Sequence, residues 1–387
     1  MRSLEIFSGA GGLACGLEKA GFEHVGLIEI NHDACNSLRK NFDNRLVYEG
    51  DIRDYDASMF AGIDLVAGGP PCQPFSLGGK GLAHNDARDM FPQAIRIISE
   101  CKPKAFIFEN VKGLLRESFK EYFDYIILRL SYPDCRIHDV ESWQQHKKRL
   151  MLCNNNYKGT RYTVTYKLIN AADYGVPQTR ERVVIVGVRD DLKITWSFPN
   201  ITHSEDALLW SQYVNYSYWE KHGISRKYND DLRNKLIAKY GMFPPTALPW
   251  LTIRDALKGV PEPQAVASTI TPDHVLKSGA KAYFGHTGSN FDYPSKTIKA
   301  GGHGVPGGEN MISFPDGTYR YFSVYEAKLI QSFPEKYVIT GAWGEAMRQI
   351  GNAVPVKLAT LIAERMFKYL ESSFYNSTLQ NTVIVSC

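Results

Sequence analysis

One cysteine in this chain stands in a stretch of glycines and prolines. Residues 68–76 read Gly-Gly-Pro-Pro-Cys-Gln-Pro-Phe-Ser, so two prolines precede Cys72 and a third follows it at position 74. Proline restricts the backbone and glycine leaves space beside it, so such a loop can hold a thiol in one orientation. A buried structural thiol, the usual state of a free cysteine, is the alternative. We expect Cys72 to be a nucleophile for covalent catalysis.

Charged residues that could assist this thiol follow two later apolar runs. Glu109 comes after Ala105–Phe108, so we expect it beside Cys72 across neighbouring strand ends, where a partly desolvated carboxyl can donate a proton. Arg180 and Arg182 occupy alternate positions and therefore share one face of an extended segment. One of them can steady a polar oxygen of a substrate ring or orient Glu109. Ordinary surface ion pairs are the competing interpretation for all three.

A glycine turn and two acidic residues indicate a site for a nucleotide-like cofactor. The first apolar run leads into Phe-Ser-Gly-Ala-Gly-Gly at 7–12, where glycines permit close approach of a ligand and a helix begins. Glu29 ends the second run and can accept both hydroxyls of a ribose, and Asp51 follows the third and can accept from an adenine amine. The spacing departs from the Gly-x-Gly-x-x-Gly of dinucleotide sites, which disfavours a nicotinamide dehydrogenase.

Alternating strands and helices must position these residues. The expected strands are Leu4–Phe7, Val25–Glu29, Leu46–Tyr48, Asp64–Ala67, Ala105–Phe108 and Val183–Val188. The expected helices are 12–20, 32–40, 89–101 and 114–130, with Asp89 as a cap and Pro92 in the first turn of the third. This order predicts an α/β fold with a parallel sheet covered on both faces.

The amino-acid composition changes near residue 190. Residues 191–324 are rich in glycine, proline and aromatics, with a single expected helix at 229–240. Helical periodicity returns near 325 and includes a helix from Val354 to Phe367, before a loosely held tail of ~15 residues. We therefore predict two domains, one formed by 1–190 together with 325–387 and an irregular one formed by 191–324.

Composition sets wider bounds. The formal net charge of +4 permits a nucleic-acid partner without establishing one. The seven cysteines contain no Cys-x-x-Cys pair, which argues against a disulfide framework or a metal site and for a reducing cytoplasm. The first residues do not form a signal-like apolar segment, and we find no run of ~18 apolar residues. We expect a soluble, cytoplasmic protein without a membrane partner.

Taken together, these segments resemble the cytosine-5 DNA methyltransferase family. The matching stretches, in the family's order, are Phe7–Leu13, Gly68–Ser76, Phe108–Gly113, Gln178–Gly187 and Gly351–Pro355. They span almost the whole chain, and several blocks in sequence are far more specific than any single motif. The compact form is similar to the bacterial enzymes of restriction–modification systems. The resemblance implies a Rossmann-like methyltransferase domain that binds S-adenosylmethionine and releases S-adenosylhomocysteine, with a smaller target-recognition domain.

The resemblance also assigns roles. Cys72 would attack carbon 6 of cytosine, Glu109 would protonate or hydrogen-bond ring nitrogen 3, and Arg182 would contact the exocyclic oxygen. Carbon 5 would then take the methyl group, and loss of its proton would expel the thiolate. Chemistry on a ring inside a duplex requires that the base leave the stack, so base flipping follows.

Further site residues follow from the same resemblance. The implied cofactor residues are Phe7, Gly9, Gly11, Gly12, Leu13, Glu29, Ile30, Asp51, Ile52, Pro70, Asn352 and Ala353. The candidate DNA contacts are Ser76, Lys80 and Arg88 in a loop expected to close over the flipped base, and Lys277, Lys281, His286, Lys296, Thr297, Lys299 and His303 in the recognition domain. That domain holds 14 Lys and Arg against 12 Asp and Glu, so affinity must come from the placement of positive groups.

Two stretches depart from the family's pattern. Residues around 134–157 are extra; the basic segment 136–167 has seven Lys and Arg against two Asp and Glu, and we expect a solvated surface excursion, with a DNA or partner contact as the alternative. Residues 203–250 carry a Trp and Tyr cluster that we expect to thicken the recognition domain's core. The leading hypothesis is a monomeric enzyme acting on double-stranded DNA, paired functionally with a restriction endonuclease. A tRNA cytosine-5 methyltransferase and a catalytically silent DNA-binding homologue remain alternatives.

Overall fold

The computed structural model describes residues 1–71, 89–153, 157–267, 269–284, 286–300 and 310–384, with side chains as far as residue 373. The chain packs into two compact units. The first comprises 1–169, 181–199 and 359–387, and the second comprises 170–180 and 200–358. The second unit therefore includes 325–358, which the sequence analysis assigned to the catalytic domain. The functional division at residues 190 and 324 stays a prediction.

A seven-stranded sheet forms the centre of the first unit. Its order is β3-β2-β1-β4-β5-β7-β6, and the strands are β1 (Arg2–Ile6), β2 (Glu23–Glu29), β3 (Val47–Glu49), β4 (Leu65–Gly68), β5 (Ala105–Val111), β6 (Tyr162–Asn170) and β7 (Glu181–Arg189). The pairs β1–β2, β1–β4, β2–β3 and β4–β5 are parallel. The strand β7 runs antiparallel to β5, so the expectation of an all-parallel sheet is wrong at this edge.

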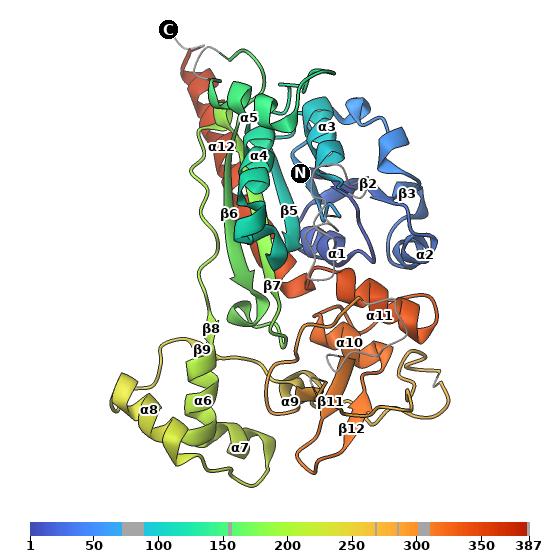
Figure 1. The fold of residues 1–387 in the computed structure, drawn as a ribbon, viewed down its shortest axis with the longest axis vertical. Coiled ribbons are helices and arrows are strands. Elements are labelled where there is room, and N and C mark those ends of the chain that lie inside the picture. The colour runs from blue at the N-terminus through green and yellow to red at the C-terminus, as the bar shows by residue number, and fades with distance from the viewer. Residues whose placement is uncertain (72–88, 154–156, 268, 285, 301–309, 385–387) are drawn as a thin grey trace. The chain divides into compact units, whose positions relative to one another are not determined.

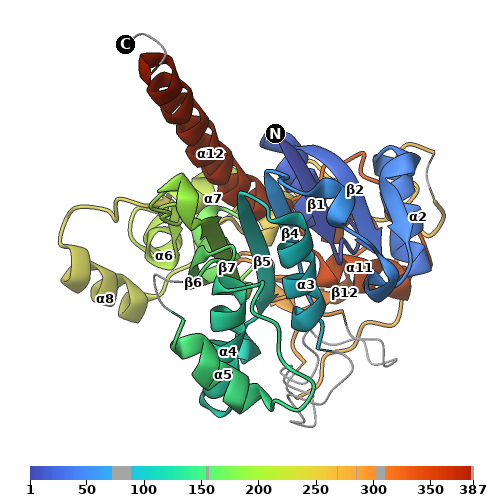
Figure 2. The ribbon, with the colours of Figure 1, turned by 90° about the horizontal axis from the view of Figure 1, so that it is seen from above.

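Helices cover both faces of the sheet. Along β5, Phe106 and Phe108 are buried on one face and Ala105 and Ile107 on the other. In Figures 1 and 2, helices α3 and α4 lie on one side and α12 on the opposite side. The helices of this unit are α1 (Gly12–Lys19), α2 (His32–Asn41), α3 (Phe91–Cys101), α4 (Lys120–Ser131), α5 (Trp143–Met151) and most of α12 (Val356–Ile384). Helix α12 continues to Ile384, so much of the predicted tail is helical, and whether it is loosely held stays a prediction.

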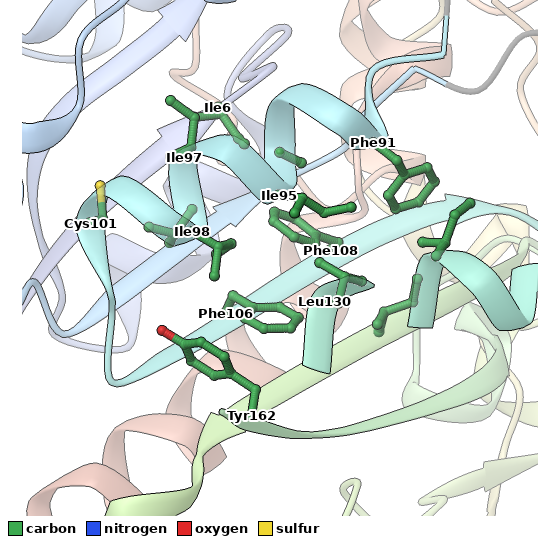
Figure 3. Packing of buried hydrophobic residues seen from close by; sticks show 14 of the residues in the cluster. Ile6, Phe91, Ile95, Ile97, Ile98, Cys101, Phe106, Phe108, Leu130 and Tyr162 are labelled. Carbon is green, nitrogen blue, oxygen red and sulfur yellow. The ribbon is translucent and has the colours of Figure 1, made fainter. Parts of the chain in front are cut away.

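The main core lies between β5 and the helices α3 and α4. Phe91, Ile95 and Ile98 recur at helical spacing on α3 and pack with Phe106 and Phe108 (Figure 3). Helix α3 begins at Phe91 with Met90 at the N-cap, so Asp89 does not occupy the cap position expected of it. Its carboxylate nevertheless accepts from the backbone N–H of Phe91, and proline stands in the first turn as predicted. This core fixes β5, the strand that carries Glu109.

The extra residues near 134–157 are more ordered than expected. Helix α5 begins with a capping box formed by Ser142 and Gln145 and buries Leu150 against the main core. Two of its basic residues are paired within the unit, Lys147 with Glu121 and Arg149 with Glu141, whereas Lys148 is exposed. Residues 136–140 are all exposed as well, so the described part of this segment is a surface excursion, as predicted, but one that is ordered around α5. The helix expected at 114–130 begins only at Lys120, after two short 3-10 turns.

The second unit is made of short elements. It contains helices α6 (Glu205–Tyr213), α7 (Ser217–His222), α8 (Asp230–Tyr240), α9 (Ile253–Ala256), α10 (Val324–Ile330) and α11 (Trp343–Asn352). Two small sheets complete it, β8 (His203–Ser204) with β9 (Leu248–Pro249), and β10 (Ser289–Asn290) with β11 (Met311–Ser313) and β12 (Tyr319–Tyr321). The helix predicted at 229–240 is confirmed, with Asn229 as its N-cap.

The aromatic insertion forms core, as expected. Tyr218, Trp219 and Trp250 are buried together with Leu208. Because these rings face the interior of the unit, they are not free to stack on bases. Across the helices that the structure describes, none is long and apolar enough to cross a membrane.

Candidate active site and cofactor site

The glycine turn after β1 adopts the backbone that its glycines allow. Phe7, Gly9 and Gly11 have φ values of 56°, 53° and 81°, all in the left-handed region that glycine adopts freely and phenylalanine does not. A Cβ at Gly9 would meet no described atom within 4 Å, so the turn borders open space. Helix α1 begins directly after Gly11, which directs its first N–H groups toward this space.

The Glu29 carboxylate closes the turn from the neighbouring strand. Its Oε2 accepts from the backbone N–H of Gly9 at 2.7 Å, and its Oε1 accepts from those of Ile30 and Asn31 at 3.0 and 2.8 Å. These bonds hold Glu29 at the carboxyl ends of β1 and β2, where ligands of such sheets bind. The arrangement orients a carboxylate next to a turn that has room for a ligand.

Some of the remaining predicted cofactor residues are exposed to solvent and others are buried. Ile30 is 66% exposed although it is a large apolar residue, whereas Leu13, Gly12 and Ile52 are buried. Asp51 caps a 3-10 turn by accepting from the backbone N–H of Arg53, and its carboxylate also pairs with the Arg53 guanidinium at 2.7 Å. That hydrogen bond holds the pKa of Asp51 below its usual value, so Asp51 is an acceptor at neutral pH. An exposed isoleucine beside two oriented carboxylates fits the edge of an adenosine group.

The entrance to the cysteine loop is tied to β5. The Asn110 side chain donates to the carbonyl of buried Pro70 at 2.9 Å. A Cβ on Gly69 would lie 3.9 Å from Glu109 Oε2, so the chain passes beside the Glu109 carboxylate just before Cys72. Cys72 itself lies outside the described residues.

Glu109 and Arg182 meet as an ion pair at the same edge of the sheet. Arg182 Nε lies 2.8 Å from Glu109 Oε1, a distance typical of an ion pair, although the angle is not that of a hydrogen bond. Both side chains are largely buried. Register pairs Val111 with Arg182, so the end of β5 faces the start of β7. Only an antiparallel β7 can do this, because a parallel strand would place Arg182 at the opposite edge.

Arg180 has different surroundings. It belongs to the second unit and is 1% exposed. Its guanidinium donates to the carbonyls of Gly351 at 2.9 Å and Ile298 at 3.5 Å. Gly351 in turn packs so tightly that a Cβ would lie 2.7 Å from the backbone of Lys299 and Ala300. The contacts described favour a role for Arg180 in holding backbone segments together, and its predicted catalytic role stays a prediction.

The second unit also contains the residues of the C-terminal motif. Asn352 is exposed at the last position of α11, and Ala353 is buried next to it. Gln178 is fully buried, and its Oε1 accepts from the backbone N–H of Ile298. Three sequence blocks near 178, 298 and 351 are thereby brought together. Closure of a cofactor pocket by Asn352 stays a prediction.

The candidate DNA contacts have mixed surroundings. Ser76, Lys80, Arg88 and His303 lie outside the described residues. Lys277, Lys281, Lys296 and Lys299 are exposed. The Thr297 hydroxyl donates to the carbonyl of Thr179 at 2.8 Å, and the His286 ring lies against the Tyr283 ring at a tilt of 43°. The four lysines are therefore accessible to a ligand, and their contact with DNA stays a prediction.

Sequence reasoning missed two residues of this region. Glu5 on β1 is 1% exposed, and burial raises its pKa well above the usual range, although a backbone hydrogen bond from Ala14 acts in the opposite direction. Asn110 ties the cysteine loop to β5, but an amide after a glutamate has no distinguishing spacing. An acidic residue two positions before the glycine turn, on a strand buried on both faces, was the available signal for Glu5.

The strand order and the open glycine turn at the carboxyl ends of β1 and β2 are those of a Rossmann-like α/β fold. The chain belongs to the C-5 cytosine-specific DNA methylase family, whose pattern matches residues 1–134 and 142–368. The family predicted from the sequence is therefore confirmed, as is the fold class.

Curated relatives are similar over part or all of the chain. Type II methyltransferase M.NgoMIV of Neisseria gonorrhoeae is 42% identical over 200 residues, which is 51% of this chain and 55% of that protein. Type II methyltransferase M.PspPI of Psychrobacter sp. is 32% identical over 96% of this chain and 80% of its own length. Type II methyltransferase M.FnuDI of Fusobacterium nucleatum is 30% identical over 95% of this chain and 94% of its own length.

Solved structures share the fold. A DNA modification methyltransferase encoded within an E. coli prophage has a TM-score of 0.61 and 20% identity, covering 96% of this chain and 99% of that chain. The S. pombe Dnmt2 methyltransferase has a TM-score of 0.57 and 16% identity, covering 95% and 98%. At these identities the likeness concerns the fold alone.

Proposed function

We propose that this member of the family transfers a methyl group from S-adenosylmethionine to carbon 5 of a cytosine flipped out of a specific duplex sequence. The observation that carries the proposal is the Glu109–Arg182 pair at 2.8 Å, beside the entrance to the Cys72 loop. An acid and a cation at the point where a cysteine loop leaves the sheet are the groups that activation of a pyrimidine ring requires.

The steps we propose follow from these positions. The Cys72 thiolate adds to carbon 6, and the displaced electron pair moves through the ring toward nitrogen 3, where Glu109 donates a proton or a hydrogen bond. Arg182 holds Glu109 and contacts the exocyclic oxygen of the cytosine. The electron pair returns through carbon 5 to take the methyl group, with S-adenosylhomocysteine as the leaving group, and nitrogen 3 gives its proton back to Glu109. Loss of the carbon-5 proton to water then expels the thiolate, which restores the double bond.

Several residues suit the methyl donor. Glu29 would accept from its ribose, Asp51 from its adenine amine, and Phe7 and Ile30 would line the base. When bound, S-adenosylmethionine supplies an activated methyl group at a sulfonium. The open space at Gly9 and the exposed apolar side chain of Ile30 support this fit.

The biological setting is part of the proposal. The relatives are named Type II methyltransferases and come from bacteria, which supports a role in a restriction–modification system of the bacterial cytoplasm together with an endonuclease. We infer that a monomer acts on the DNA, since one chain carries all of the expected catalytic residues.

The test supplies S-adenosylmethionine labelled with tritium in the methyl group, together with either duplex DNA or tRNA. Nucleosides from each polymer are then separated. We expect label in 5-methyl-2′-deoxycytidine from the duplex. Label confined to tRNA, or present on an exocyclic nitrogen, would contradict the proposal.

A further inference from the structure

A polar groove lies entirely within the second unit. Its volume is about 440 Å³, and strand β10 and the β11–β12 hairpin supply much of its wall. The polar groups that line it include Thr179, Lys227, Thr287, Asn290 and Lys296. Among the described residues that line it, none is acidic. The groove therefore presents cations and uncharged hydrogen-bonding groups.

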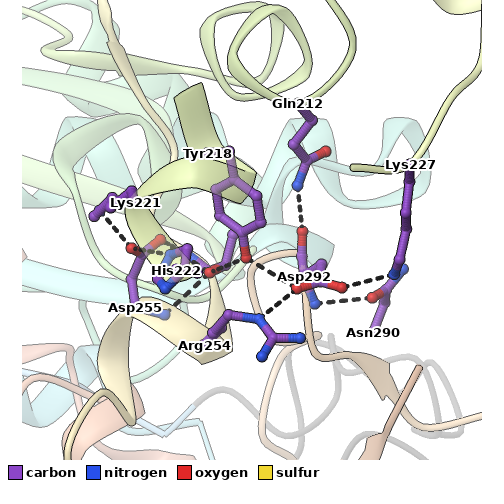
Figure 4. Close-up of polar contacts among 10 residues, drawn as sticks. Gln212, Tyr218, Lys221, His222, Lys227, Arg254, Asp255, Asn290 and Asp292 are labelled. Carbon is purple, nitrogen blue, oxygen red and sulfur yellow. Dashed lines mark hydrogen bonds and ion pairs between the residues drawn. The ribbon is translucent and has the colours of Figure 1, made fainter. Parts of the chain in front are cut away.

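Lys227 reaches this groove from the aromatic insertion at residues 203–250. Its ammonium lies 2.8 Å from Asp292 Oδ2 (Figure 4). It also lies 5.2 Å from the centre of the Trp219 ring. The side chain nevertheless remains 45% exposed. Two contacts thus hold the lysine in place while one side of it faces solvent, which lowers the entropy lost when it binds a ligand.

The charge around Asp292 does not cancel. Its carboxylate is 4% exposed and is shared by Lys227 and Arg254, the latter at 2.7 Å. Two cations on one carboxylate leave one positive charge in excess. The Tyr218 hydroxyl also donates to Asp292, and Gln212 donates to its backbone carbonyl, so the carboxylate is fixed from the insertion side (Figure 4).

Lys296 adds a second positive charge from the framework segment. It is exposed, and its ammonium lies 3.2 Å from the Thr287 hydroxyl, a neutral partner. Lys227, Arg254 and Lys296 outnumber two carboxylates, Asp292 and Glu205, the second of which accepts from the hydroxyl of the lining residue Tyr293. The groove therefore has one positive charge in excess, in a predicted recognition region of low net charge. Ammonium groups on flexible stems act as point charges toward phosphates, whereas the planar edge of a base calls for bidentate groups.

We propose that this groove binds the phosphodiester backbone of duplex DNA, with Lys227 and Lys296 as its two cations. The inference rests on the proposed function for the choice of DNA as partner. It assigns the aromatic insertion a second role beyond core packing, because the insertion delivers Lys227. Since phosphates carry no sequence information, the contact would position the duplex rather than read it.

The experiment measures the affinity of the full chain for duplex DNA as a function of salt. Each lost phosphate contact should reduce the slope of log affinity against log salt by about 0.9, and affinity at 0.1 M salt by roughly 5–10-fold. K227Q and K296Q should each show this loss, on duplexes with and without the target sequence alike. K227R, which keeps the charge, should retain the parent's slope.

The matched control is K239Q. Lys239 is an exposed lysine of the same insertion that pairs with Asp206 at 2.6 Å and does not belong to the described lining of the groove. Its replacement should leave the slope unchanged. Thermal melting of each variant shows whether the fold is retained. Because K227R keeps the positive charge, it shows whether a loss of affinity in K227Q comes from the charge or from a change in structure.

Three results would overturn the proposal: slopes of K227Q and K296Q equal to the parent's, a loss confined to the target duplex, or a loss on tRNA but not on DNA. Methylation of DNA by the parent, measured in parallel, keeps the two proposals apart. Transfer with unchanged slopes refutes the groove alone. Reduced slopes without transfer refute the proposed reaction alone.

Discussion

The residues of the catalytic edge in the first unit and those of the groove in the second unit are positioned by different kinds of interaction. Glu109 and Arg182 meet because seven residue pairs of an antiparallel ladder fix β5 against β7. Lys227 and Arg254 meet because both side chains pair with one buried carboxylate, Asp292. Backbone pairing positions the residues proposed for chemistry, whereas side-chain charge positions Lys227, one of the two cations proposed for DNA. The first arrangement should tolerate loss of a side chain, whereas loss of the shared Asp292 carboxylate should destabilise the second.

Replacing the proposed nucleophile should have the largest effect. Cys72→Ser should reduce methyl transfer below detection, since a neutral hydroxyl is a far weaker nucleophile than a thiolate. Label transfer and gel shift on the same duplex measure the two functions. Binding should persist, and turnover near the parent's rate would exclude Cys72 as the nucleophile.

Replacing Glu109, the proposed acid, should have the second largest effect. Glu109→Gln keeps the shape of the side chain but removes the carboxyl group that would act as the acid, so transfer should slow by about 100-fold or more, with little change in thermal stability. Glu181→Gln is the control, because Glu181 is an exposed neighbour paired with Lys112. Equal losses in the two variants would mean that local charge, rather than proton donation, matters.

Replacing Arg182 should affect the rate of methyl transfer, whereas replacing Arg180 should affect the stability of the fold. Arg182→Met should slow transfer by roughly 10–100-fold because Glu109 loses the group that orients it. Arg180→Met should instead lower the free energy of unfolding by about 1–3 kcal/mol, since buried carbonyls lose their donor. Turnover numbers and denaturant unfolding provide the readouts. The reverse pattern would place Arg180 in the active site.

Removing the shared carboxylate should destabilise the second unit. Asp292→Asn leaves Arg254 and Lys227 without their buried counter-charge, at a cost of about 3 kcal/mol. Asp316→Asn, at an exposed loop position, is the comparison. Denaturant unfolding followed by tryptophan fluorescence measures the difference, and equal midpoints would show that the network does not hold the groove.

The smallest expected effect concerns pH. Burial raises the pKa of Glu5 in the folded chain, whereas in the unfolded chain it stays near 4.5. The folded state therefore retains a proton that the unfolded state has released, so stability should fall as pH rises from about 4.5 and level off above the folded-state pKa. Glu5→Gln should abolish this component. Thermal melting of both proteins from pH 4 to 8 measures it, and parallel curves would count against the shift.

Much of the catalytic edge could be predicted from the sequence. Strand ends follow from apolar runs, so Glu29 and the glycine turn lie where they were predicted. The apolar run does not show that β5 continues to Val111, so Glu109 lies within the strand rather than after it. The direction of β7 could not be predicted, because an apolar strand has the same pattern whichever way it runs. Its direction nevertheless decides that Arg182 meets Glu109.

The second unit was much less predictable. Lys227 and Asp292 are 65 residues apart, and nothing in their spacing indicates that they pair. Arg180 illustrates the same limit, since its position next to Arg182 predicted a shared role but its contacts lie with Gly351 and Ile298. Long-range pairing of single side chains leaves no periodic signal in one sequence.

The most direct measurement is bisulfite sequencing of a mixed-sequence plasmid treated with the purified chain and S-adenosylmethionine. The account predicts protected cytosines confined to one short motif, on duplex DNA, and none in a parallel reaction with Cys72→Ser. Full conversion of every cytosine, with binding of S-adenosylmethionine confirmed, would contradict it.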